Sequence, residues 1–177
     1  MNTSELVELL QQSAVEHLTA YRQFQVQDFG SVATIVTTDF EAVHAYKHGD
    51  YQRCLQLSTQ NIHTLLYAKC MISVMIDPPF IQLLDDDIVS MTALTLIINP
   101  ECREWSLTGC ITQMILSLYL MTQCQLKLRH SVTSLAQTLD YIEVTQRRYS
   151  AEWTLDHLTL KLIKHKVLIN SIRNVHV

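Results

Sequence analysis

The sequence is poor in the residues that interrupt helices, with only three Gly and three Pro among 177 residues. β-Hairpins, sandwiches and phosphate-binding loops need these residues for their turns, so their scarcity argues against such structures. Residues suited to N-caps recur along the chain instead, at Asp50, Asp77, Asn99, Ser131 and Ser150. We therefore predict an all-α fold of antiparallel helical hairpins with about seven helices, arranged as a repeat array or as an irregular bundle.

Charged residues are also scarce. They make up 17% of the chain, against about a quarter in a typical soluble domain, while 48% of the residues are hydrophobic. This composition excludes a disordered chain. The length suits one sizeable core, so we expect a single all-helical domain over residues 1–177 or a piece of a longer helical-repeat protein.

The five Cys form no Cys-x-x-Cys pair, and their number is odd. Neither fact suits a disulfide framework, so a reduced, cytoplasmic chain is expected. The first residues, Met1–Glu5, include an acidic side chain and lack the basic and then apolar pattern of a secretory signal.

The net charge of −4 is unevenly distributed. Residues 127–177 contain eight Lys and Arg against four Asp and Glu, whereas residues 1–126 contain five against thirteen. Our preferred interpretation is that the basic end complements the acidic front of the same fold, without nucleic-acid or membrane binding. The alternative is that it attracts an acidic partner, nucleic acid or a lipid surface.

The triplet Gly49-Asp50-Tyr51 joins a helix stop to a helix start. Glycine ends a helix in the left-handed conformation, and the aspartate caps the next one. Over residues 38–66 the pattern resembles a tetratricopeptide repeat, although Leu66 stands where that family has a Pro. The resemblance implies a non-catalytic scaffold that binds a protein or peptide in a groove formed by first helices, lined here by Thr38, Glu41, Ala45 and Tyr46.

Apolar spacing and caps together predict the helix boundaries. Thr37 or Thr38 is expected to cap the helix that ends at Gly49, and the next is expected to begin at Asp50 and either stop near Thr59 or continue toward Ile76. The other expected helices cover residues 4–24, 80–98 and about 107–129, one capped by Ser131 and one capped by Ser150.

Residues 105–126 carry no charged side chain. The length permits a membrane span, but Ser, Thr and Gln recur throughout the segment. We expect a central core helix, with a membrane-associated helical bundle as the alternative.

Catalytic and metal-binding motifs give no positive signal. His44 and His48 are four residues apart, but the sequence offers neither a third ligand nor the glutamate of a helical zinc site. The cluster Asp85-Asp86-Asp87 lacks the second carboxylate motif of magnesium-diphosphate enzymes. We therefore assign no catalytic residue, metal or cofactor, and keep an α-helical enzyme with an unidentified core site as the alternative function.

A short helical array leaves part of its apolar surface uncovered. We expect an exposed apolar patch near a chain end or along the predicted groove, where a partner or a second copy of the chain would bind.

Overall fold

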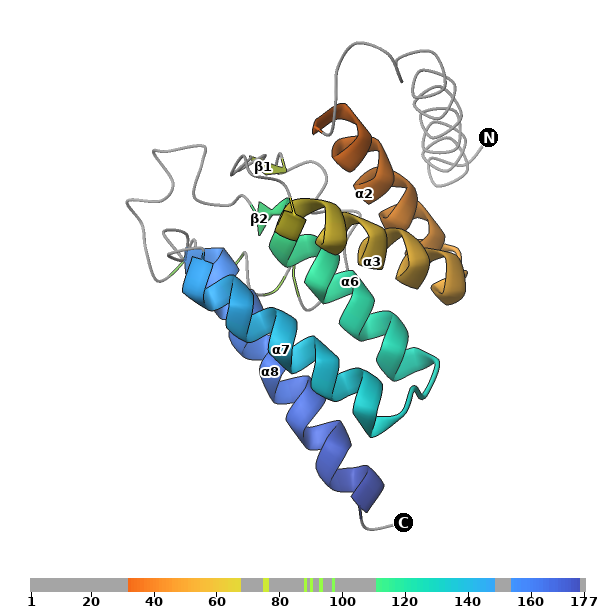
Figure 1. Cartoon of the computed structure of the whole chain (residues 1–177), viewed down its shortest axis with the longest axis vertical. Helices are drawn as coiled ribbons and strands as arrows, with labels where there is room; N and C mark the ends of the chain where they lie inside the picture. Colours follow the sequence, from red (N-terminus) through yellow and green to blue (C-terminus); the bar gives the residue numbers. More distant parts are fainter. Residues whose placement is uncertain are drawn as a thin grey trace.

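The computed structural model describes residues 32–67, 75–76, 88, 90, 93, 97, 111–148 and 154–175, nearly all of them helical. The prediction of an all-α fold is confirmed for this part of the chain (Figure 1). A count of about seven helices is not confirmed, nor is a tetratricopeptide-type array. Five helices are described: α2 (Val32–Lys47), α3 (Tyr51–Tyr67), α6 (Gln113–Lys127), α7 (Val132–Arg148) and α8 (Thr154–Val175).

Helix α6 is the centre of the bundle and contacts each of the other four described helices (Figure 1). All its residues from Gln113 to Gln125 are buried. This confirms the predicted core helix and explains the absence of charge, because a helix covered on all sides would have to desolvate every charged side chain.

Two tight turns have the same backbone geometry. After α2, the Asp50 N–H donates to the Ala45 carbonyl and the Gly49 N–H to the Tyr46 carbonyl, with Gly49 at φ 77°. These two bonds form a Schellman motif, which satisfies the last carbonyls of a helix. The predicted stop at Gly49 is therefore confirmed.

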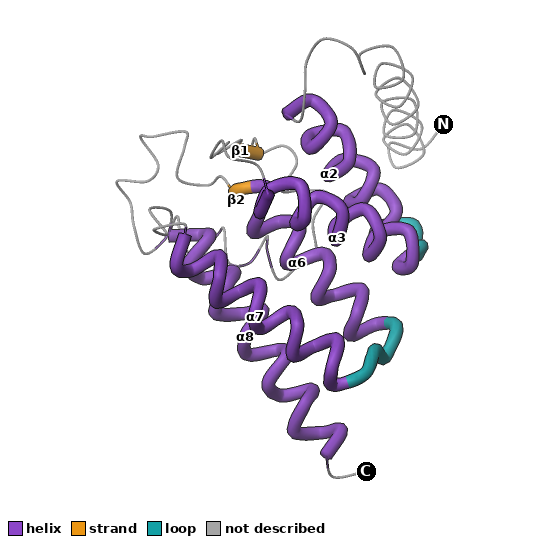
Figure 2. Tube along the Cα trace, in the orientation of Figure 1, coloured by secondary structure: helices purple, strands orange, loops and turns teal. Residues whose placement is uncertain are grey.

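After α6, the His130 N–H donates to the Gln125 carbonyl and the Arg129 N–H to the Leu126 carbonyl. Arg129 holds the left-handed conformation here, at φ 53°. The two turns fold α2 onto α3 and α6 onto α7 as helical hairpins (Figure 2).

Both predicted caps next to these turns are confirmed. The Arg53 N–H donates to Asp50 Oδ1 at 3.1 Å, and the Ser134 N–H donates to Ser131 Oγ at 3.4 Å. Tyr51 is half-buried, as expected for a residue between two helices, and its ring lies edge-on to that of Tyr46, with the centroids 5.7 Å apart.

Two predicted boundaries are wrong, and a third lies between the two alternatives. Thr37 and Thr38 lie inside α2 and cap nothing at its start, because the helix already includes Val32. The third helix continues past Thr59 to Tyr67, in the direction of the longer alternative, whereas Ile76 itself pairs as a strand. The core helix begins at Gln113, later than expected, because the two residues before it are extended.

The extended residues form one short antiparallel pair, β1 (Met75–Ile76) with β2 (Ile111–Thr112), in which Met75 faces Thr112 and Ile76 faces Ile111. The predicted helix over 4–24 and the boundaries at Asp77, Asn99 and Ser150 lie outside the described residues. So does most of the predicted helix over 80–98.

Candidate functional site

The four residues predicted to line a binding groove come from α2. Thr38, Glu41 and Ala45 are buried in the fold, and Tyr46 is half-buried. Glu41 forms an ion pair in which Oε2 lies 3.7 Å from a guanidinium nitrogen of the exposed Arg53. Little of their surface is therefore available to a ligand in this conformation, and their role in partner binding stays a prediction.

His44 and His48 lie together at the end of α2. Their rings are stacked with centroids 4.1 Å apart, and His48 Nδ1 donates to the His44 carbonyl oxygen at 2.9 Å. Burial lowers the pKa of His44, and the neighbouring His48 and Arg53 lower it further. Within the described part of the chain, no three His, Cys, Asp or Glu side chains are grouped as metal ligands.

A buried polar network, which sequence analysis missed, joins the three helices α2, α3 and α6. Asp39 Oδ1 accepts hydrogen bonds of 2.8 Å from Asn61 Nδ2 and from Ser117 Oγ. Asn61 Nδ2 also lies 3.3 Å from the Ile35 carbonyl oxygen. The second carboxyl oxygen, Oδ2 of Asp39, receives no hydrogen bond from any residue that the structure describes.

Burial raises the pKa of Asp39 from 3.8 to about 7, although the bonds from Ser117 and Asn61 act in the opposite direction. Desolvation therefore dominates, and the carboxyl group exchanges its proton near neutral pH. A proton on Oδ2 would also turn that oxygen into a donor. The Oε1 atom of Gln113, one turn before Ser117 on α6, is a buried acceptor without a partner in the described part of the chain.

The only sequence signal for this network is that Asp39 interrupts the apolar face of α2. Its partners follow it by 22 and 78 residues, so no local pattern links them. A buried, hydrogen-bonded network of this kind fixes how helices pack against each other, which is the role we assign to it.

A second buried carboxyl group joins α8 to the start of α6. Asp156 Oδ1 accepts a 3.0 Å bond from the Thr112 N–H. Burial raises the pKa of Asp156 to about 6, against the effect of the bonds from Thr112. The bond satisfies a backbone donor at the N-terminus of α6, so the role is structural.

Two buried thiols lie between α3 and α6. A hydrogen bond that the Cys124 thiol donates to Cys54, together with the burial of the group, raises the pKa of Cys124. A raised pKa disfavours the nucleophilic thiolate of Cys124, and both free thiols are buried.

The exposed face of α8 is the feature best suited to binding. Three of its apolar side chains are exposed near the end of the helix: Leu168 by 43%, Ile169 by 37% and Ile172 by 61%. Lys161 and Lys164 are exposed on the same helix. We call these five residues the α8 surface.

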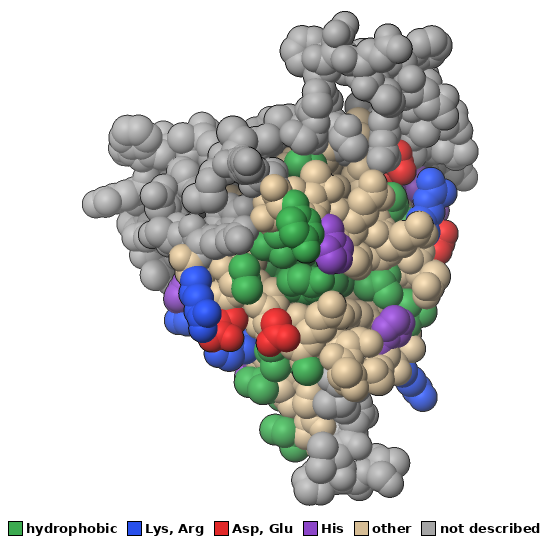
Figure 3. Space-filling model, viewed as in Figure 1, with side chains coloured by type: hydrophobic (Ala, Val, Ile, Leu, Met, Phe, Trp, Pro, Cys, Tyr) green, Lys and Arg blue, Asp and Glu red, His purple; other side chains and the backbone are tan. Residues whose placement is uncertain are grey.

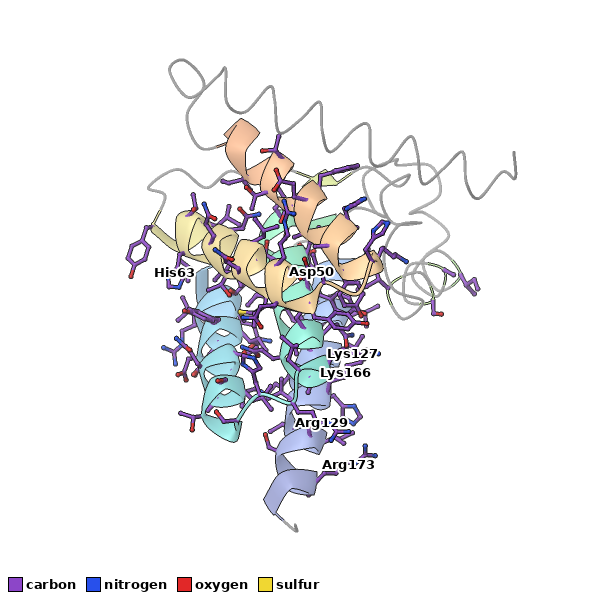
Figure 4. The ribbon with its side chains drawn as sticks, turned by 90° about the vertical axis from the view of Figure 1, so that its right-hand side faces the viewer. Asp50, His63, Lys127, Arg129, Lys166 and Arg173 are labelled. Atoms are coloured by element: carbon purple, nitrogen blue, oxygen red, sulfur yellow. The ribbon has the colours of Figure 1, made fainter. Side chains whose placement is uncertain are left out.

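The figures show where the α8 surface lies. The last turns of α8 extend beyond the α6–α7 turn (Figure 1), and apolar side chains reach the surface along the lower part of the molecule (Figure 3). Figure 4 shows further cations in the same lower half, from the end of α6, the turn after it and α8: Lys127, Arg129, Lys166 and Arg173.

None of the helices in the described ranges combines the length and the apolar character that a membrane crossing requires. Comparison with known proteins gives no match: no protein-family model fits the sequence, and no curated protein or solved structure is similar to the chain.

Proposed function

We propose that the chain is a non-catalytic protein–protein interaction module built from helical hairpins of tetratricopeptide type. Two hairpins, α2–α3 and α6–α7, are closed by turns of the same geometry, which supports a hairpin-based scaffold. The free thiols of Cys54 and Cys124 support a reducing, cytoplasmic setting.

The observation that carries the proposal is the exposed apolar end of α8. The opposite face of this helix is buried in the core, where it contributes Leu155, Leu160, Ile163 and Val167. Leu168 and Ile172, four residues apart, therefore form a second apolar face that the fold itself does not cover. Exposed apolar side chains that cluster and are rimmed by polar ones mark interaction surfaces.

Affinity capture with the full chain tests the proposal. Replacing Leu168 and Ile172 by Ser in one variant is expected to abolish capture of specific proteins, because it removes the apolar centre of the contact. The matched control is Tyr67→Ser, which alters a side chain that is 82% exposed at the end of α3. Equal capture by the wild type and the α8 variant would contradict the proposal.

A further inference from the structure

The five residues of the α8 surface form one continuous strip. Along a helix, side chains three or four residues apart are neighbours. Lys161 therefore adjoins Lys164, which precedes Leu168 by one turn, and Leu168 adjoins Ile172. From Lys161 to Ile172 the strip spans about 16 Å at 1.5 Å per residue, which is three helical turns.

The cations of this strip form no ion pair with another described residue. Among the described residues, the ion pairs are Arg53 with Glu41 and Arg147 with Glu143, and neither involves α8. Lys161 and Lys164 have no carboxylate within pairing distance in that part of the chain, and Arg173 in the last turn has none either. The surface thus presents apolar side chains flanked by cations that no described carboxylate pairs with, and the complementary ligand is apolar with negative flanks.

The shape of the strip favours a protein helix over other acidic ligands. A lipid surface binds amphipathic helices through a broad apolar face, but the broad apolar face of α8 is buried against α6 and α7. Nucleic acid would use the cations but gain nothing from Leu168, Ile169 and Ile172. A second α8 would bring cations toward cations. An acidic amphipathic helix matches both the cations and the apolar side chains of this three-turn strip.

We propose that the α8 surface binds an acidic amphipathic helix of a partner protein, about three turns long, with its apolar side chains against Leu168 and Ile172 and its carboxylates against Lys161 and Lys164. This inference rests on the proposed function and specifies the partner. The charges steer the encounter and the apolar contact holds the complex.

The experiment uses the full chain and three fluorescent 16-residue peptides, with binding measured by anisotropy. The probe carries Leu at positions spaced three and four apart and Glu at the flanking positions. One control has the same composition in an order that destroys this spacing, and the other has Lys in place of Glu. We expect the probe to bind about tenfold more tightly than either control, and the affinity to fall as salt is raised.

Matched variants locate the site. The double variant Leu168→Ser with Ile172→Ser is expected to weaken probe binding about tenfold or more, and Lys161→Glu with Lys164→Glu is expected to shift the preference to the Lys peptide. Tyr67→Ser and Arg147→Glu, which make the same kinds of change elsewhere, are expected to bind within about twofold of the wild type. Circular dichroism confirms that each variant is folded.

Four results would overturn the inference: equal binding of all peptides, probe binding that ignores the α8 variants, tighter α8-dependent binding to phosphatidylserine vesicles or to a single-stranded RNA, or a dimer abolished by the same variants. The capture experiment distinguishes failure of the proposed function from failure of this inference about the partner. If capture of cellular proteins still depends on Leu168 and Ile172 while acidic peptides do not bind, only the partner chemistry is wrong. If capture is independent of them as well, both proposals fail.

Discussion

Replacing Asp39 by Asn tests whether desolvation controls the buried network. Asn has nearly the same shape, and its carbonyl oxygen can still accept the bonds from Asn61 and Ser117, but it cannot ionise. In the wild type, the pKa of Asp39 rises from 3.8 to about 7 on folding. Between these two values the folded state binds more protons than the unfolded state, so the free energy of unfolding decreases as pH rises.

The magnitude follows from the two pKa values. Ionisation of Asp39 lowers the free energy of unfolding by about 4 kcal/mol in total, because each factor of ten in proton affinity is worth about 1.4 kcal/mol. This decrease is complete once the pH is above about 7. About 3 kcal/mol of this loss falls between about pH 5 and about pH 8. Asp156, whose pKa is about 6, also lowers the free energy of unfolding as the pH rises, but its contribution is complete at a lower pH than that of Asp39.

Urea unfolding followed by circular dichroism, repeated at several pH values, measures the effect. The stability of Asp39→Asn relative to the wild type is expected to increase by about 3 kcal/mol from about pH 5 to about pH 8, whatever its offset at low pH. Asp140→Asn, which removes an exposed carboxylate from α7, is the control and is expected to leave the pH dependence unchanged. Parallel curves for Asp39→Asn and the wild type would show that the carboxyl group is already ionised at pH 5 in the folded protein.

The two Schellman turns give opposite predictions. Gly49→Ala is expected to destabilise the fold by about 1 kcal/mol, because Gly49 has φ 77° and an added Cβ meets no atom within 4 Å, so the cost is conformational alone. Arg129→Gly is expected to stabilise it by up to about 1 kcal/mol, because it relieves the same left-handed strain at φ 53°. Thermal unfolding of both variants checks the signs, and a gain from Gly49→Ala or a loss from Arg129→Gly would contradict the argument.

The sequence by itself determined the fold class and the hairpin at Gly49. These depend on local chemistry: scarce helix breakers, a left-handed stop, and caps at Asp50 and Ser131 that bond the amide three residues ahead. The uncharged stretch also identified α6 as the core helix, since burial on every side requires the absence of charge along the whole segment.

The tertiary structure decided the features that depend on contacts between residues far apart in the sequence. The start of α2 was misplaced because Thr37 and Thr38 have the composition of caps, yet packing against α3 and α6 holds them inside a helix. The turn at Arg129 carries no glycine, so nothing in its local sequence marks the left-handed residue.

The pairing of Asp39 with Asn61 and Ser117 needs three helices brought together by the fold, and spacing along the chain encodes none of it. The exposed end of α8 has the same origin. Helix α8 has apolar residues on both of its faces, and the position of α6 and α7 determines that Leu155 is buried in the core while Leu168 remains in contact with water.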